Sequence, residues 1–291
     1  MIQCLNVYKR FAGREVLSGV NIDIPNGQIF GLLGPSGAGK TTLIKILTGQ
    51  LGFDSGRVTV LDKDVKALSG EDKKKIGIMM DQFGVYERFS CADNLKVFAD
   101  IYGVPQSRIK EALEQVGLAD AYHTRAVNLS KGMRARLCLA RVFMHDPKIL
   151  FLDEPTSGLD PQTTRQIHRI ILDKKESGCT IFLTTHNMEE AASLCGRVAL
   201  LNEGKIVESG APEEICRKYN HQKKIMIHLS SGKDEELTHT PGAADEICRL
   251  MKEGKIETIH SSEPDLETVF LELTGRKLEE EEENEKQHDS F

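Results

Sequence analysis

No window of the 291-residue sequence approaches the roughly 20 consecutive apolar residues that a membrane-spanning helix needs. We therefore expect a soluble chain. Positive charge is not in excess either, because 38 Lys and Arg stand against 44 Asp and Glu, a formal net charge of −6. This balance argues against non-specific binding to DNA or RNA, and we expect no nucleic-acid partner.

Paired cysteines are also missing. The seven cysteines are scattered, odd in number and never arranged as C-x-x-C, which argues against a disulfide framework or a zinc site. We expect reduced, mostly buried thiols of a cytosolic protein. Apolar residues make up 40% of the chain, enough for the buried core of one large or two ordinary domains.

Glycine is concentrated in one stretch, GLLGPSGAGKTT, from Gly31 to Thr42. Gly34, Gly39, Lys40 and Thr41 fit the pattern G-x-x-x-x-G-K-[ST], in which a glycine-rich loop turns backbone N–H groups inward to cradle a phosphate. An apolar run precedes the loop and a helical segment follows it, so the positive end of a helix dipole also points at the anion. An ordinary glycine-rich turn with a surface lysine is the alternative, and these flanking segments argue against it.

The pattern implies ATP and Mg²⁺ as cofactors. Lys40 is expected between the β- and γ-phosphates, and the Thr41 hydroxyl is expected as a ligand of Mg²⁺. The residues expected to bind nucleotide in this loop are Gly34, Pro35, Ser36, Gly37, Ala38, Gly39, Lys40, Thr41 and Thr42.

Two acidic residues follow a second apolar run, at 149–152. In open parallel sheets ligands bind at the carboxyl ends of the strands, so Asp153 and Glu154 are placed to act on a nucleotide. We expect Asp153 to hold Mg²⁺, largely through water, and Glu154 to polarise the attacking water as a general base. The two acids alone are weak evidence for a nucleotide site. Together with the glycine loop they are strong evidence for one.

Hydrophobic periodicity divides the rest of the chain. Segments 56–80, 148–152, 179–183, 197–201 and 205–208 favour strands, and the helix expected over 162–177 completes a β-α-β unit and so predicts a parallel sheet. A helical period over about 94–144 predicts a helical insert, with a subdomain over about 84–145. After about residue 219 an alternating strand and two helices predict a small α+β domain to 276, and residues 277–291 are expected to be a disordered acidic tail.

Together these residues resemble the ATP-binding cassette (ABC) family. NLSKGM, at 128–133, is similar to the family signature, and LFLDEPTSGLDP, at 150–161, is similar to its Walker B and D-loop segments. Gln82 matches the Q-loop glutamine, His186 the switch histidine and Phe11 the aromatic residue that stacks on adenine. The final match is PDLETVFLELTGR, at 264–276, which resembles a C-terminal segment of ABC-2 and antibiotic- or drug-resistance exporters.

The resemblance implies a fold and a set of roles. The fold is α/β: a P-loop NTPase (RecA-like) core over residues 1–218, with an N-terminal antiparallel β-subdomain, the helical insert and the small C-terminal appendage. His186 would contact the γ-phosphate, and Gln82 would reach Mg²⁺ and the attacking water. Ser130, Lys131, Gly132 and Met133, with Asp160, would contact ATP held by a second nucleotide-binding subunit, either an identical chain or a sister cassette.

Several positions have a second interpretation. Tyr8 competes with Phe11 for the adenine, and Asp160 could be only a helix N-cap. Lys131 and Met133 depart from the glycine and glutamine of the commonest signature. Lys131 could add charge near the γ-phosphate or face solvent as a tolerated variant.

The resemblance finally implies a function: an ATPase subunit that couples ATP-driven dimerisation and hydrolysis to export of a drug, antibiotic or peptide through a separate membrane permease. The subunit would lie at the cytoplasmic face of the cell membrane. The surface of segment 83–95 would form a groove that binds the coupling helix of the permease. The alternatives are a soluble ABC ATPase acting on DNA or ribosomes, and a P-loop phosphotransferase. The sequence does not disclose the transported substrate.

Overall fold

The computed structural model describes residues 1–80, 84–221 and 223–275. The predicted Q-loop residue Gln82 therefore lies outside the described residues, as do Phe83 and the acidic tail. Within the described ranges, no helix combines the length and the apolar character needed to cross a membrane.

The chain begins with a four-stranded antiparallel sheet, as the resemblance implies. Ile2, Cys4 and Val7 of one strand and Val20, Ile22 and Ile24 of another are buried, with an irregularity between Cys4 and Val7, so one face packs on the core and the other meets solvent. The strand order is β2-β1-β4-β5, with bounds β1 (Ile2–Phe11), β2 (Arg14–Ile24), β4 (Ser55–Val60) and β5 (Lys63–Asp64).

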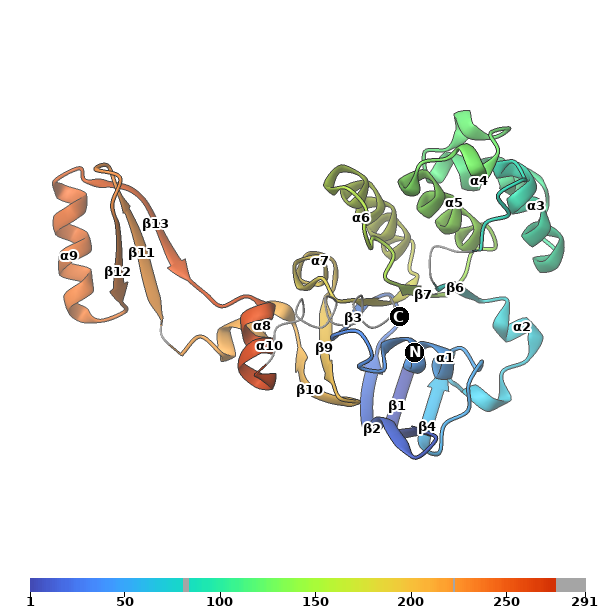
Figure 1. Cartoon of the computed structure of the whole chain (residues 1–291), viewed down its shortest axis with the longest axis horizontal. Helices are drawn as coiled ribbons and strands as arrows, with labels where there is room; N and C mark the ends of the chain where they lie inside the picture. The colour runs from blue at the N-terminus through green and yellow to red at the C-terminus, as the bar shows by residue number, and fades with distance from the viewer. Residues whose placement is uncertain (81–83, 222, 276–291) are drawn as a thin grey trace, which may run out of the picture.

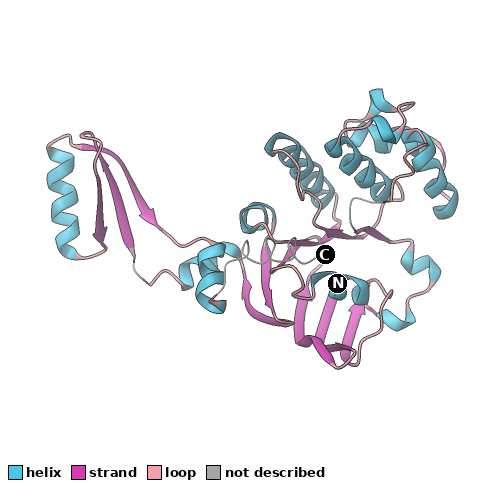
Figure 2. Ribbon diagram, viewed as in Figure 1, coloured by secondary structure: helices cyan, strands magenta, loops and turns pink. Residues whose placement is uncertain are grey.

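A six-stranded sheet forms the centre of the molecule (Figure 2). The predicted parallel sheet is confirmed for β6, β7, β8, β3 and β9, and β10 adds an antiparallel edge. Every residue of β3, β7 and β8 is buried, as expected for strands covered on both faces. The order is β10-β9-β3-β8-β7-β6, with bounds β3 (Ile29–Leu33), β6 (Ile76–Met80), β7 (Ile149–Asp153), β8 (Thr180–Thr185), β9 (Arg197–Asn202) and β10 (Lys205–Gly210).

Two cores lie on opposite faces of this sheet because successive side chains of a strand alternate. Phe151 and Phe182 pack with the antiparallel sheet and with α1 (Lys40–Leu47), their ring centroids 5.7 Å apart. Leu150 and Leu183 pack with the helices of the other face. These helices include α6 (Pro161–Glu176) and α7 (Met188–Leu194).

The helical insert lies above the β6 end of the sheet (Figure 1). Ser90 and Ser130 cap its first and last long helices by accepting from the backbone N–H groups of Asp93 and Met133. Its elements are α3 (Cys91–Tyr102), α4 (Ser107–Gln115), the short 3₁₀ turns η2 (Ala119–Ala121) and η3 (Ala126–Asn128), and α5 (Lys131–Phe143). Between β5 and β6, in a stretch expected to be strand-rich, lie a 3₁₀ turn, η1 (Val65–Ala67), and a short helix, α2 (Gly70–Lys73).

The segment expected as one C-terminal domain, 219–276, divides into two parts in the structure. A three-stranded sheet and one helix, which we call the C-terminal lobe (224–262), project away from the cassette and enclose a small core of Ile227, Leu229 and Leu250 (Figure 1). The last helix instead returns beside α8 (Pro212–Lys218) and buries Leu266, Val269 and Phe270 in the main core. The elements are β11 (Lys224–Leu229), β12 (Asp234–Thr238), α9 (Pro241–Lys252), β13 (Ile256–Ser262) and α10 (Leu266–Thr274).

We therefore propose that α10 belongs to the cassette unit together with residues 1–218. The separate domain would be the C-terminal lobe alone. Apolar periodicity could not distinguish these cases, because the helix of the lobe and α10 both carry an apolar stripe, and only the fold decides which core each stripe meets.

Candidate nucleotide site

The glycine loop closes between β3 and α1, where the sequence predicts it. Gly34 approaches β9 so closely that a Cβ there would lie 2.2 Å from the carbonyl oxygen of Leu201. Gly39 has a left-handed φ of 111°, and a Cβ there would lie 2.9 Å from the Val16 carbonyl oxygen. Both glycines are therefore required by the packing of the loop against its neighbours.

The loop borders a cavity of about 240 Å³ that also receives both predicted acids. Residues far apart in the sequence are brought together here because β3 and β7 end at the same edge of the sheet. The lining residues are Val16, Pro35, Ser36, Gly37, Gly39, Lys40, Thr41, Thr42, Asp153 and Glu154.

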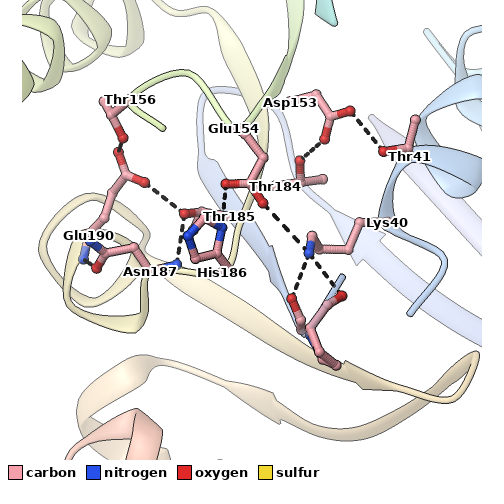
Figure 3. A network of polar contacts seen from close by, with 12 residues as sticks. Lys40, Thr41, Asp153, Glu154, Thr156, Thr184, Thr185, His186, Asn187 and Glu190 are labelled. Atoms are coloured by element: carbon pink, nitrogen blue, oxygen red, sulfur yellow. Dashed lines mark hydrogen bonds and ion pairs between the residues drawn. The ribbon is translucent and has the colours of Figure 1, made fainter. Parts of the chain in front are cut away.

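Asp153 ends β7 and faces two hydroxyl groups (Figure 3). Thr41 donates to one carboxylate oxygen at 2.9 Å, across a sequence separation of 112 residues, and Thr184 donates to the other. Hydroxyl and carboxylate oxygens are the ligands that Mg²⁺ prefers, so Thr41 and Asp153 fit a magnesium site.

Glu154 leaves the strand with an unusual backbone. Its φ of 49° lies in the left-handed region, and its N–H donates to the Thr184 carbonyl at 3.0 Å. A non-glycine residue held there costs about 1–2 kcal/mol, which the surrounding bonds must offset. Its carboxylate lies 2.8 Å from His186 Nδ1 and 3.6 Å from Lys40 Nζ.

Lys40 is buried and its ammonium group lies over its own loop. Nζ donates to the carbonyl oxygens of Gly34 at 2.6 Å and Pro35 at 3.1 Å. Lys40 and Glu154 thus bring a cation and a carboxylate to the cavity, and His186 contacts that carboxylate from behind, a combination suited to binding phosphate and moving a proton.

His186 lies in a loop whose partners the sequence did not single out. Glu190, on the first turn of α7, is buried, and its carboxylate accepts from the hydroxyl groups of Thr185 and Thr156 (Figure 3). It also accepts from His168. Burial raises the pKa of Glu190, but these three hydrogen bonds outweigh it and hold the pKa below its ordinary value. A glutamate three residues after an N-cap Asn187 was the available signal for this residue.

The signature residues lie elsewhere in the chain. Ser130 caps α5, and none of residues 130–133 lines the cavity of the glycine loop. Gly132 lets α5 approach α6 closely, because a Cβ would lie 2.5 Å from the Thr163 side chain. The Lys131 ammonium lies against the D-loop, 2.3 Å from where a Cβ of Gly158 would be.

Asp160 is the N-cap of α6, as its second interpretation expects. It accepts from the backbone N–H groups of Gln162 and Thr163 and from the Thr163 hydroxyl, and these bonds lower the pKa of its carboxyl. An N-cap role leaves the other carboxylate lone pairs available, so a contact with a second subunit stays a prediction.

The two aromatic candidates lie on β1, and neither lines the cavity. Phe11 is 44% exposed and pairs with Arg14, two residues before Val16, which does line it. Tyr8 packs against Gly19, its hydroxyl 3.0 Å from where a Cβ would be. The register places Val16 opposite Lys9 and Arg10, between the two aromatic residues, so the assignment of Phe11 to the adenine stays a prediction.

Comparison with known proteins identifies the family. The family model for the ABC transporter matches residues 17–157. A fluoroquinolones export ATP-binding protein of Mycobacterium tuberculosis is 40% identical over 92% of this chain and 90% of its own length. A methionine import ATP-binding protein of Clostridium acetobutylicum is 38% identical over 79% of this chain and 75% of its own length.

Among solved structures, a subunit of an ABC transporter complex from Clostridium perfringens superposes with a TM-score of 0.67 at 28% identity. The match covers 75% of this chain and 94% of that protein. The chain therefore belongs to the ABC transporter family, and it is an ATPase cassette of that family.

Proposed function

We propose that this cassette is the ATP-hydrolysing subunit of an exporter that moves a drug, antibiotic or peptide through a separate membrane permease. Export is supported by the extent of the likeness. The fluoroquinolones export protein aligns over 92% of the chain, and the methionine import protein over 79%. The subunit would lie at the cytoplasmic face of the membrane, held there by the permease.

The observation that carries the ATPase activity is the meeting of the glycine loop with Asp153 and Glu154 in one cavity. Backbone N–H groups of the loop and the α1 N-terminus would bind the phosphates, and Lys40 would exchange its carbonyl contacts for the β- and γ-phosphates. Thr41 and Asp153 would hold Mg²⁺, with Gln82 as a further expected ligand. The ion, when bound, neutralises charge that develops on the transferred phosphoryl group.

Glu154 would take a proton from the attacking water. The left-handed backbone aims its carboxylate into the cavity, and His186 holds one of its oxygens at 2.8 Å. His186 would also contact the γ-phosphate, so the two side chains would orient water and phosphate relative to one another.

A second subunit would complete the site. Ser130 and the following N–H groups form a helix N-terminus that lies outside the cavity of its own chain. ATP held by one cassette would therefore bind the signature of the other, with Asp160 and the D-loop at the same interface. Hydrolysis would remove the phosphate contacts shared by the two subunits and release the dimer.

The permease would bind the helical insert. A groove of about 370 Å³ is lined in part by Val85 and Glu87, and the same segment carries Tyr86 and Phe89, whose side chains are 50% and 43% exposed. Exposed apolar groups beside a concave surface are typical of protein interfaces. The groove is lined by Gly84, Val85, Glu87, Ala126, Leu129, Lys131 and Arg134.

The test is recovery of the partner from solubilised native membranes with tagged Glu154→Gln protein, with and without ATP and Mg²⁺. Glu154→Gln should bind ATP and dimerise but hydrolyse about 10²–10⁴-fold more slowly than wild type. We expect it to retain a polytopic membrane protein. Lys40→Ala, which should lose nucleotide binding, is the control for ATP-dependent dimerisation.

Two results would contradict the proposal in different ways. Recovery of ribosomes, DNA or no partner would favour a soluble ABC ATPase and remove the transport function. Undiminished turnover by Glu154→Gln would remove Glu154 as the base, whatever partner is found.

A further inference from the structure

A buried carboxylate lies directly behind the pair formed by Glu154 and His186. The side chain of Glu190 is 2% exposed. Its Oε2 accepts from the Thr185 hydroxyl at 2.8 Å, and its Oε1 accepts from the Thr156 hydroxyl at 2.5 Å (Figure 3). The same Oε1 accepts from His168 Nε2 at 2.9 Å. One carboxylate thus binds three side chains.

These three side chains come from three segments that border the reaction site. Thr185 immediately precedes His186 at the end of β8, Thr156 follows Glu154 by two residues, and His168 lies on α6. The carboxylate therefore links the loop of the histidine to the turn of the glutamate.

The same loop is closed on its other side by the backbone. The Asn187 N–H donates to the Thr185 hydroxyl at 3.0 Å, and the Glu190 N–H donates to Asn187 Oδ1 at 2.8 Å. Glu190 thus holds both neighbours of His186. Its carboxylate binds Thr185, and its backbone N–H binds Asn187.

The direct contact between His186 and Glu154 is poorly suited to hold this geometry alone. The two side chains are 38% and 27% exposed, and an ion pair in contact with water restricts its partners only weakly. A buried, fully hydrogen-bonded network restricts them far more. The lowered pKa of Glu190 keeps the carboxylate ionised, an acceptor for all three donors.

We propose that Glu190 is a positioning residue for ATP hydrolysis, which holds the loop of His186 and the turn of Glu154 in fixed relation through Thr185 and Thr156. It touches neither the nucleotide cavity nor, in the mechanism above, any reacting atom. The inference rests on the roles proposed for Glu154 and His186.

The first test is the steady-state ATPase rate of the full-length chain carrying Glu190→Gln. Glutamine keeps the shape but replaces one acceptor oxygen by a donor, so at least one of the three partners loses its acceptor. We expect kcat to fall about 10- to 100-fold, with the KM for ATP changed less than about twofold, because binding groups stay in place while the reacting groups shift.

Two further variants separate positioning from folding. Glu189→Gln, on the exposed neighbouring residue, is the matched control and should keep the wild-type kcat. Thr156→Val removes a single hydroxyl without changing the shape of the side chain, and it should lower kcat in the same direction if Glu190→Gln does not fold. A network that only stabilised the fold would change the melting temperature and leave kcat per folded molecule unaltered.

A double-mutant cycle then tests the route through His186. Glu190→Gln should cause a smaller loss of single-turnover rate in the His186→Ala background than in wild type, because one of the two groups that it positions is already gone. A second loss of equal size would overturn the inference, as would wild-type kcat in both Glu190→Gln and Thr156→Val. Undiminished turnover by His186→Ala would instead show that the proposed role of His186 is wrong and would remove the inference with it.

Discussion

Neighbouring acids of this cassette differ in what surrounds them, and the difference sets their chemistry. Glu154 is a quarter exposed and borders the cavity, whereas Glu190, which accepts a hydrogen bond from Thr156 in the turn after Glu154, is buried among hydrogen-bond donors. The first is placed to exchange a proton with bound water. The second is placed to remain charged.

The charge of Glu190 should make part of the stability of the fold depend on pH. Burial raises its pKa, but the hydrogen bonds from His168, Thr156 and Thr185 lower it further, to below the ordinary 4.5. A carboxyl with a lower pKa in the folded state stabilises the fold above its unfolded pKa, and the contribution is lost as the pH falls through the folded pKa. The difference in unfolding free energy between wild type and Glu190→Gln should therefore be present at pH 7 and shrink below about pH 4.5.

Urea unfolding at a series of pH values between 7 and 3.5 measures this difference. The exposed Glu189→Gln variant serves as the reference and should track wild type throughout. A difference that stays constant across the series would mean that Glu190 acts by shape and not by charge.

At the level of elements, the glycine at position 34 of the loop is required by contact with the neighbouring strand as well as by the ligand. Gly34 touches the backbone of β9, and a Cβ there would lie 2.2 Å from the Leu201 carbonyl oxygen. Because that atom belongs to a buried central strand, the clash is relieved only if the strand or the loop moves.

Gly34→Ala should therefore destabilise the cassette by about 1–3 kcal/mol even when no nucleotide is present. Gly242→Ala is the opposite case, since Gly242 lies in α9 with open space around its Cβ position and should gain about 0.5–1 kcal/mol. Thermal melts of the two variants give the comparison. An unchanged melting temperature for Gly34→Ala would show that the loop adapts and that only the ligand requires the glycine.

At the level of the whole molecule, the chain leaves the cassette after α8, builds the C-terminal lobe and returns as α10. Leu266, Val269 and Phe270 are each no more than 2% exposed and pack in the main core, while the lobe has a separate small core. The cassette is therefore completed by the end of the described chain.

This arrangement predicts opposite results for two deletions. A chain ending at residue 218 lacks α10 and should melt several degrees lower, because each lost core side chain removes about 1.5–3 kcal/mol of burial. A chain in which 224–262 is replaced by a short Gly-Ser linker keeps α10 and should retain the melting temperature and ATPase rate of wild type. Equal losses in both variants would mean that the lobe is an integral part of the cassette.

Much of the site could be predicted from the sequence because its signals are local. The glycine loop, the strand that delivers Asp153 and the cap at Ser130 each follow from a few adjacent residues whose backbone shape or hydrogen bonds are set by their neighbours. The parallel order of the central strands followed from one β-α-β unit. Residues 81–83 and 276–291 lie outside the described residues, so the roles given to Gln82 and to the acidic tail stay predictions.

The sequence by itself therefore determined which residues could bind and cleave ATP, because the candidate residues lie within short motifs of adjacent positions. Only the tertiary structure decided which other side chains support the site residues. Glu190 meets Thr156 and His168, and α10 meets the main core, through contacts between segments far apart in the chain. No local pattern specifies such contacts, because they depend on how the elements pack and not on what each element is.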